Sequence, residues 1–320
     1  MKGLSGAVDL LRKSKRVILS AHINPDGDAI GSLLALGLGL RRLKKKVTFL
    51  SPDGIPANYR ALPGVEHIVR RAAGDYDLAV AVDCSTSEML GAAAGLFRGI
   101  GAVLEIDHHP FRRPFGTACY LDPQAAAVGE MIYRILRRLH VPIDRAIAAN
   151  IMTSLIVETG SFRLPSLRPE TFLLCAQMLK TGIDFFSLTE AVYWSRTRQN
   201  ALLSGICLSR CRFLLRGRLV WSLVSRADFK KCHGRDEDVD PVADEMRSID
   251  GVEIAILFRE KSAAKLRVSL RSKREINVAR LAEAYGGGGH YDVAGCVISN
   301  TTASINLFVR RAAAMLSSRP

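Results

Sequence analysis

The chain has 320 residues and a formal net charge of +14, with 48% hydrophobic and 24% charged residues. This composition excludes a disordered chain and can supply the cores of two domains. The positive charge favours anionic partners such as nucleic acids, nucleotides or a membrane surface, although a basic surface that only aids solubility has the same composition.

Cysteine usage and the lengths of apolar runs indicate a cytoplasmic protein. The seven cysteines are scattered and form no Cys-x-x-Cys motif, which is typical of reduced thiols. Residues 1–15 lack the apolar core and cleavage site of a signal peptide. The longest apolar helix candidate, 29–40, is too short to span a bilayer, so we expect no membrane interaction.

Apolar runs alternate with helix-forming segments over the first half of the chain. Four short runs, nearly free of charge, are typical of strands that are buried on both faces of a parallel sheet. They lie at 17–20, 47–50, 78–82 and 103–106. With a helix at 29–43 and further helix-like segments between the runs, they predict an α/β domain with a doubly wound, mainly parallel sheet. Further helices are expected at 125–140, 144–157, 169–180 and 185–194.

The pattern changes after about residue 195. Runs at 212–215 and 219–225, separated by Arg216-Gly217, predict a β-hairpin. Further strands are expected at 252–258, 265–270 and 293–298, and helices at 197–209, 240–249, 277–285 and 303–316. We therefore expect a first domain over 1–195, a connecting helix over 196–210 and a smaller C-terminal α/β domain over 211–320.

The motif His22-Ile-Asn-Pro-Asp26-Gly-Asp28 lies between the first expected strand and helix. Ligands of open α/β sheets bind at this end of the strands. Pro25 and Gly27 bend the loop, so that the histidine and the two aspartates can converge. One imidazole and two carboxylates suit a divalent metal such as Mn²⁺. The alternative is an Asp-Gly turn in which Asp28 caps the following helix.

Two later strands end in residues of the same kind. Asp83 follows the run 78–82, and Asp107-His108-His109 follow the run 103–106. A lone aspartate at this place is often only a loop cap. Together with the first motif, however, these residues bring four carboxylates to one edge, where cations are needed to offset their charge. Two divalent ions about 3.5–4 Å apart would do so, and the reaction would be in-line attack of hydroxide on phosphorus.

In this order, the motifs resemble those of the DHH phosphoesterase superfamily. The run 158–163 resembles its fourth motif, and 271–273, 286–290 and 294–295 resemble the DHH-associated C-terminal domain. The two-domain size is most similar to that of the NrnA-type enzymes. These degrade very short RNA oligomers and dephosphorylate 3'-phosphoadenosine 5'-phosphate.

The resemblance implies two Mn²⁺ ions, with Mg²⁺ or Co²⁺ as alternatives. The first ion would be held by His22, Asp26 and Asp83, and the second by Asp28, Asp83, His108 and Glu158. Asp83 would bridge the two ions. The family usually has Asp where this chain has Glu158, so we expect the second ion to be held differently or more weakly.

The remaining roles are also implied by the resemblance. His109 would face the scissile phosphate, and Asp107 would orient a ligand imidazole. Substrate would be bound by Arg163, Arg271, Gly287, Gly288, Gly289 and His290. Arg112 and Arg113 would either bind phosphate or form a solvated pair, whereas 44–46 is expected to be a surface run.

The implied function is hydrolysis of short RNA or DNA oligonucleotides to 5'-mononucleotides, and of 3'-phosphoadenosine 5'-phosphate to AMP, in a cleft between the two domains. Alternatives are a phosphodiesterase for linear or cyclic dinucleotides and a RecJ-type single-strand exonuclease. A non-catalytic nucleotide-binding module with a decayed second metal site is a third. The expected partners are oligonucleotides and nucleotides, with a homodimer left open.

Overall fold

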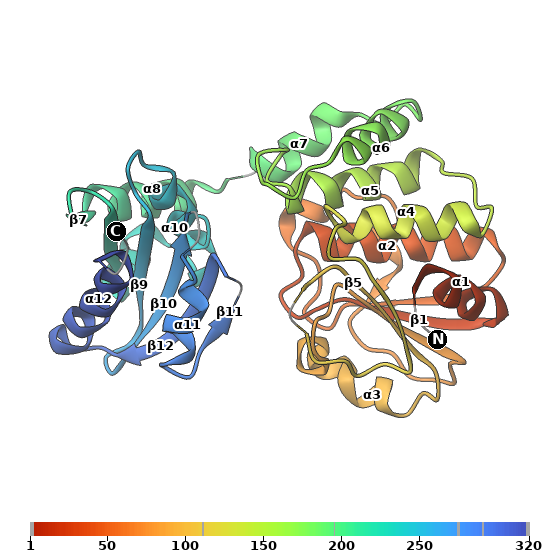
Figure 1. Cartoon of the computed structure of the whole chain (residues 1–320), viewed down its shortest axis with the longest axis horizontal. Coiled ribbons are helices and arrows are strands. Elements are labelled where there is room, and N and C mark those ends of the chain that lie inside the picture. The colour runs from red at the N-terminus through yellow and green to blue at the C-terminus, as the bar shows by residue number, and fades with distance from the viewer. Residues whose placement is uncertain (1–2, 111, 195, 274–275, 290, 318–320) are drawn as a thin grey trace. The chain divides into compact units, whose positions relative to one another are not determined.

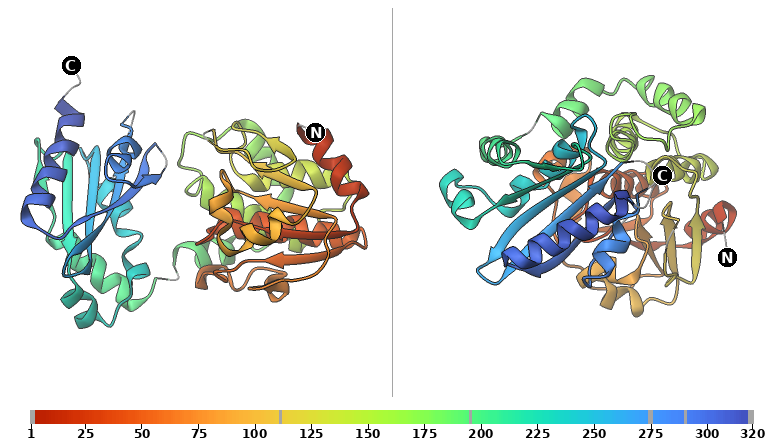
Figure 2. Two further views of the ribbon diagram at one scale, coloured as in Figure 1. Left: turned by 90° about the horizontal axis from the view of Figure 1, so that it is seen from below. Right: turned by 60° about the vertical axis from the view of Figure 1, so that its left-hand side comes forward.

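The computed structural model describes residues 3–110, 112–194, 196–273, 276–289 and 291–317. The chain divides into two compact units, 1–195 and 196–320. Each unit has its own sheet and its own apolar cores (Figures 1 and 2).

Among the described residues, the first unit is built on a six-stranded sheet in the order β3-β2-β1-β4-β5-β6. Every pair of neighbouring strands is parallel, which confirms the expected sheet. The strands are β1 (Arg16–Ser20), β2 (Lys46–Leu50), β3 (Ile68–Val69), β4 (Leu78–Val82), β5 (Val103–Asp107) and β6 (Ala118–Leu121). The two edge strands, β3 and β6, were not predicted.

Helices cover both faces of this sheet (Figure 1). Successive residues of β1 point to opposite sides, so Val17 and Leu19 lie in one core and Ile18 in the other. The first core contains side chains of α1 (Gly3–Lys13), α2 (Gly27–Arg42), α4 (Val128–Arg138) and α5 (Arg145–Glu158). The second contains side chains of the 3₁₀ segment Ser87–Ala93 and of α3 (Ala94–Arg98). Outside α5 lie α6 (Pro169–Leu179) and α7 (Phe185–Tyr193).

The strand order reverses at the centre of the first sheet. β1 pairs with β2 on one side and with β4 on the other, so the chain leaves β1 and β4 in opposite directions across the sheet. In doubly wound sheets such a reversal opens a space beyond the carboxyl ends of the central strands. The residues that follow β1, β4 and β5 therefore meet at this edge.

The second unit has a mixed sheet in the order β11-β12-β10-β9-β8-β7 among its described residues. The predicted hairpin is confirmed, because β7 pairs antiparallel with β8, and only β8 and β9 are parallel. The strands are β7 (Arg212–Leu214), β8 (Leu219–Val224), β9 (Ile254–Ser262), β10 (Lys265–Ser272), β11 (Gly288–Gly289) and β12 (Val293–Ser299).

Helices also lie on both faces of the second sheet. They are α8 (Arg198–Ser209), α9 (Arg226–Cys232), α10 (Val242–Ser248), α11 (Val278–Glu283) and α12 (Thr302–Ser317). The segment 196–210 was expected to connect the domains, but α8 packs inside the second unit. Leu203 and Cys207 share a core with Val220, and the Ser222 hydroxyl donates to the Cys207 carbonyl at 2.7 Å.

None of the helices in the described parts of the chain is both long enough and apolar enough to cross a membrane.

Candidate active site

The loop after β1 turns sharply into α2. Asn24 has a left-handed φ of 49°, and its N–H donates to Asp53 Oδ2 at 2.8 Å. Asp26 is the N-cap of α2 and accepts from the Ala29 N–H at 3.0 Å. The cap is therefore Asp26 and not Asp28, which lies in the first turn of the helix.

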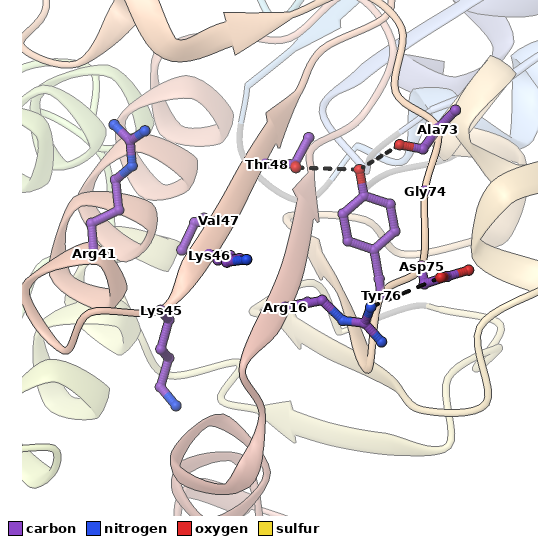
Figure 3. A pocket seen from close by; sticks show the side chains of 10 residues that line it. All are labelled: Arg16, Arg41, Lys45, Lys46, Val47, Thr48, Ala73, Gly74, Asp75 and Tyr76. Atoms are coloured by element: carbon purple, nitrogen blue, oxygen red, sulfur yellow. Dashed lines mark hydrogen bonds and ion pairs between the residues drawn. The ribbon is translucent and has the colours of Figure 1, made fainter.

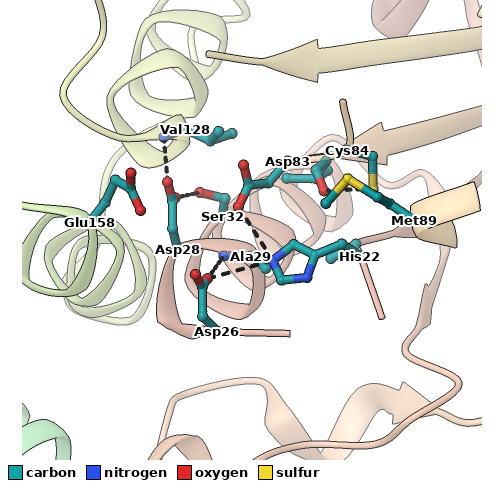
Figure 4. Close-up of polar contacts among 12 residues, drawn as sticks. His22, Asp26, Asp28, Ala29, Ser32, Asp83, Cys84, Met89, Val128 and Glu158 are labelled. Atoms are coloured by element: carbon teal, nitrogen blue, oxygen red, sulfur yellow. Dashed lines mark hydrogen bonds and ion pairs between the residues drawn. The ribbon is translucent and has the colours of Figure 1, made fainter. Parts of the chain in front are cut away.

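Asp83 follows β4 in a left-handed conformation, with φ of 58°. Its side chain is 4% exposed, and among the described residues its Oδ1 accepts no hydrogen bond. His22 Nε2 lies 3.6 Å from Asp83 Oδ2 and 3.8 Å from Asp26 Oδ1. Figure 4 shows these three side chains pointing toward one another, although they come from two different strand ends.

The two histidines after β5 have different partners. His108 Nδ1 lies 3.1 Å from the Ala125 carbonyl, while His109 Nδ1 lies 2.7 Å from Asp107 Oδ1. Asp107 was expected to orient a ligand imidazole, but it contacts His109, which was assigned to the phosphate. The difference arises because a backbone carbonyl, supplied by Ala125, takes the place of a carboxylate at His108.

Glu158 is the last residue of α5, and its Oε1 lies 3.6 Å from His108 Nε2. The same His108 atom lies 3.9 Å from Asp28 Oδ2. Thr159 then ends the helix, since its hydroxyl donates to the Leu155 carbonyl and accepts from the Phe162 N–H. The structure thus brings Glu158 to the place where the family motif predicts a carboxylate.

Two clusters of possible metal-ligand atoms result, and Asp83 connects them. His22, Asp26 and Asp83 form the first cluster, and Asp28, His108 and Glu158 form the second. Within each cluster the ligand atoms lie within 4.8 Å of one another. Asp83 also forms such a group with His108 and His109, so it joins the two clusters.

The electrostatics of the clusters favour a bound cation. Burial, followed by the charges of Asp28 and Asp26, raises the pKa of Asp83 well above its usual range. Burial also raises the pKa of Asp28. Burial opposes the charged form of His22, but its hydrogen bond to Asp26 and the charge of Asp83 raise its pKa to about 9. Asp83 Oδ1 lies 3.4 Å from His109 Nδ1 but accepts no hydrogen bond among the described residues. This oxygen and the crowded carboxylates fit divalent cations, which offset their charge.

Ser32 and Ser154 were missed by the sequence analysis. Asp28 Oδ1 accepts from the Ser154 hydroxyl at 2.7 Å and from the Ser32 hydroxyl at 2.9 Å. Asp28 Oδ2 accepts from the Val128 N–H at 2.9 Å. Ser32 lies one helical turn after Asp28, which was a usable signal, whereas Ser154 approaches only through the packing of α5 against α2.

The proposed substrate-binding residues have structural partners of their own. Arg271 Nε donates to Asp244 Oδ2 at 2.9 Å, and Arg163 Nε donates to the Gly160 carbonyl. His290 lies outside the described residues.

The glycines that were expected to approach an anion make hydrogen bonds and strand contacts within the second unit. Gly287 donates its N–H to the Ala282 carbonyl at 2.9 Å. Gly288 and Gly289 pair with β12, and a Cβ at Gly289 would meet the Val293 carbonyl oxygen at 2.4 Å. A Cβ at Gly288 would meet open space, but Gly288 is half-buried, whereas Gly287 and Gly289 are exposed.

Arg112 fits neither of its two expected roles. Its side chain is 7% exposed and pairs with Glu105, which is 1% exposed. Glu105 also accepts from the Phe115 N–H at 2.7 Å, so this buried pair holds the loop after His109. Arg113 does form a surface contact, 3.5 Å from Glu88.

A depression of about 500 Å³ lies at the amino ends of β1 and β2, opposite the sheet edge that carries the two clusters (Figure 3). Arg16 and Lys46 begin β1 and β2 there, and Arg41 lies in the last turn of α2. Cations at this position complement the negative end of a helix dipole. Lys45 Nζ donates to the Arg12 carbonyl at 3.0 Å, so it caps α1. The depression lies at the amino ends of parallel strands, away from both clusters.

Comparisons with known proteins cover both units. Residues 16–156 match the DHH family, N-terminal domain, and residues 229–318 match the DHHA1 domain. The bifunctional oligoribonuclease and PAP phosphatase NrnA of Thermus thermophilus is 28% identical over 285 residues, which are 88% of this chain and 84% of that protein.

Solved structures share the fold. An exopolyphosphatase-related protein from Bacteroides fragilis has a TM-score of 0.89 at 22% identity, covering 98% of this chain and 95% of that one. RecJ from Thermus thermophilus, in complex with Mn²⁺, has a TM-score of 0.58 at 14% identity and covers 99% of this chain and 55% of that one.

Proposed function

Because this chain is a phosphoesterase of the DHH superfamily with a DHHA1 domain, we propose that it hydrolyses short oligonucleotides and 3'-phosphoadenosine 5'-phosphate. The products would be 5'-mononucleotides and AMP, and the compartment would be the cytoplasm. The observation that carries this proposal is the pair of ligand clusters joined by Asp83 at the carboxyl edge of the sheet. The similarity to NrnA of Thermus thermophilus along most of both chains supports the choice of substrates.

We propose that each cluster holds one divalent cation, with Mn²⁺ as the first choice and Mg²⁺ or Co²⁺ as alternatives. His22, Asp26 and Asp83 would hold one ion, and Asp28, His108 and Glu158, together with Asp83, the other. Bound cations of this kind neutralise phosphate charge and lower the pKa of a water molecule. The presence of Mn²⁺ in the RecJ structure, which shares the fold, agrees with this choice.

His109 would act on the substrate directly. Its Nδ1 is held by Asp107 at 2.7 Å, and we place its imidazole against a substrate phosphate. From that position the imidazole would stabilise negative charge or donate a proton to the leaving oxygen. Asp107 would keep the ring in this orientation, since its Oδ1 also accepts from the His109 N–H.

The second unit would supply further contacts to the substrate phosphate or base. Arg271, His290 and the backbone of Gly287, Gly288 and Gly289 are the proposed groups there, and Arg163 is the proposed group in the first unit. Asp244 would orient the Arg271 guanidinium by accepting from the Arg271 Nε, and other N–H groups of the guanidinium would bind a phosphate.

A substrate panel tests the proposal. Purified protein is incubated with Mn²⁺ and RNAs of 2 to 24 nucleotides, 3'-phosphoadenosine 5'-phosphate, and linear or cyclic dinucleotides. We expect turnover to be fastest on RNAs of a few nucleotides and on 3'-phosphoadenosine 5'-phosphate. A preference for 24-nucleotide RNA would favour a RecJ-type exonuclease, and a preference for dinucleotides alone a dinucleotide phosphodiesterase. Binding without turnover would contradict an enzymatic function.

A further inference from the structure

Glu130 is a buried carboxylate that belongs to neither cluster. It lies on α4, its side chain is 4% exposed, and it pairs with the guanidinium groups of Arg134 and Arg168. The Arg168 Nη2 to Glu130 Oε1 distance is 2.8 Å. Glu130 Oε2 accepts from the Ala126 N–H at 3.1 Å. A buried charge with this many donors fixes the backbone around it.

The backbone that Glu130 holds is the segment 122–127, between β6 and α4. Arg134 also pairs with Asp122, so one cation contacts both the first residue of this segment and Glu130. The Ala125 carbonyl of the same segment contacts His108 Nδ1 at 3.1 Å. The Val128 N–H, directly after the segment, donates to Asp28 at 2.9 Å.

The contact with Ala125 determines which nitrogen of His108 can bind a metal. A carbonyl oxygen only accepts hydrogen bonds, so Nδ1 must carry the proton when the ring is neutral. The lone pair is then on Nε2, which faces Glu158 at 3.6 Å and Asp28 at 3.9 Å. In the other tautomer Nε2 carries the proton and cannot be a ligand.

Arg168 links this segment to the chain that follows Glu158. It is the N-cap residue of α6, at the end of the connection from α5. The network around Glu130 thus reaches the second cluster in two places. Ala125 and Val128 contact His108 and Asp28, and Arg168 lies at the end of the connection that follows Glu158. Asp26 and Asp83 of the first cluster have no contact with Glu130 or its two arginines among the described hydrogen bonds and ion pairs.

We propose that Glu130, Arg134 and Arg168 are positioning residues for the second metal ion, and that they act by fixing the His108 tautomer and the Asp28 carboxylate. The proposal rests on the two-metal function and adds the residues that position the ligands of the second metal ion. It implies that weakening the network impairs the second ion selectively. A purely structural ion-pair network would change stability without changing either the tautomer or the affinity for that ion.

The test uses the full chain and the variant Arg168→Met, which removes the guanidinium and keeps a long apolar stem. Long-range ¹H–¹⁵N NMR of the metal-free protein at about pH 8, above the usual pKa of imidazole, reports the His108 tautomer, assigned with His108→Gln. Calorimetric Mn²⁺ titration reports the two affinities. Arg168→Lys is the conservative rescue. Arg210→Met is the matched control, because Arg210 pairs with the buried Asp228 in the second unit.

We expect the parent to show His108 with its proton on Nδ1, and Arg168→Met to show both tautomers. The second Mn²⁺ dissociation constant should rise roughly 10- to 100-fold while the first is unchanged. Arg168→Lys should restore most of the affinity, and Arg210→Met should leave both affinities unchanged. If Arg168→Met does not fold, Glu130→Gln carries the same expectations.

A single Nδ1–H tautomer together with an unchanged second affinity in Arg168→Met would overturn the proposal, and so would an equal loss of both ions. If the parent binds no second ion, the two-metal function fails instead. In that case the tautomer comparison alone still decides whether the network orients His108.

Discussion

Asp83 is the residue on which both clusters depend. It is buried, its φ of 58° lies in the left-handed region, and its Oδ1 accepts no hydrogen bond from the described residues. A strained backbone and a buried oxygen without a hydrogen bond both cost free energy, and such costs are typical of functional sites. A cation between the clusters would offset the electrostatic part of this cost.

The variant Asp83→Asn separates function from stability. The raised pKa of Asp83 means that its charge destabilises the folded metal-free protein at pH values above the usual aspartate pKa. In EDTA at neutral pH, the variant should therefore melt at or above the temperature of the parent. With Mn²⁺ the order should reverse, and turnover should fall about 10³-fold or more. Near-normal turnover at saturating Mn²⁺ would refute the bridging role.

Variants of Glu158 test whether the second cluster binds a metal ion. Glu158→Gln keeps the size of the side chain but removes its charge, so it should weaken Mn²⁺ binding and sharply reduce kcat. Glu158→Asp restores the usual family residue and should retain substantial activity. Mn²⁺ titration of activity compares the parent with both variants. A Glu158→Gln curve that matches the parent would show that this carboxylate is not a ligand.

Single residues were predictable where chemistry follows a strand end. His22, Asp83 and the run 107–109 could be placed together because each follows an apolar run of a parallel sheet. Ser154 could not be, because its partner Asp28 is 126 residues away and only the packing of two helices brings them together. The role of Arg112 could not be predicted for a related reason. Its partner Glu105 is a charged residue inside an otherwise apolar strand, and the sequence does not show that the two side chains pair.

The first turn of α2 positions the loop that carries His22 and Asp26. Gly27, in this turn, allows α2 to lie close to α5. A Cβ at this position would meet Val157 Cγ2 at 2.4 Å and the Tyr59 ring at 2.9 Å. Val157 directly precedes Glu158, so a displaced α2 changes the spacing between the two clusters.

We expect Gly27→Ala to reduce kcat and to destabilise the fold by about 1–3 kcal/mol, as overpacking does. Gly205→Ala is the control, because Gly205 lies inside α8 with open space around its Cα. That substitution should stabilise the chain by about 0.4–1 kcal/mol. Thermal melts and steady-state kinetics give both results. Unchanged kinetics in Gly27→Ala would show that the α2–α5 distance is not critical.

Helix α9 is held at its start by a carboxylate with a depressed pKa. Burial opposes the charge of Asp228, but hydrogen bonds from Arg210 and Ser225 lower its pKa to about 2. A depressed pKa adds stability that is present above the unfolded pKa and is lost as pH falls through the folded one.

Asp228→Asn should therefore destabilise the second unit by about 1–2 kcal/mol at pH 7. The difference from the parent should shrink between about pH 4 and pH 2. Urea unfolding followed by Trp221 fluorescence in a Trp194→Phe background measures this, with the exposed Glu237→Gln as control. A difference that stays constant over this range would mean that the Asp228 charge does not contribute.

Elements with an apolar pattern or a turn signal beside them were predictable, and several others were not. The helix at 27–42 and the hairpin at 212–224 follow from apolar periodicity and a turn. The edge strand β3 has too few residues to show a period, and the glycines of β11 carry no strand signal. Only the pairing with β12 makes the last of these a strand.

Across the whole molecule, the first unit would supply the metal ligands, His109 and Arg163, and the second unit would supply the remaining substrate contacts. Arg271 lies on β10 of the second unit, so Arg271→Ala should mainly raise KM. Loss of one charge-assisted phosphate contact costs about 1.5–3 kcal/mol, or roughly 10- to 150-fold in KM. Arg267→Ala, on the same strand, is the control. Equal KM values for Arg271→Ala and the parent would remove Arg271 from the substrate site.

The most direct test of the central claim is anomalous diffraction from crystals grown with Mn²⁺. We expect two peaks about 3.5–4 Å apart at the carboxyl edge of the first sheet. One should be bound by His22, Asp26 and Asp83, and the other by Asp28, Asp83, His108 and Glu158. A single peak, or two peaks that do not share Asp83, would contradict this claim.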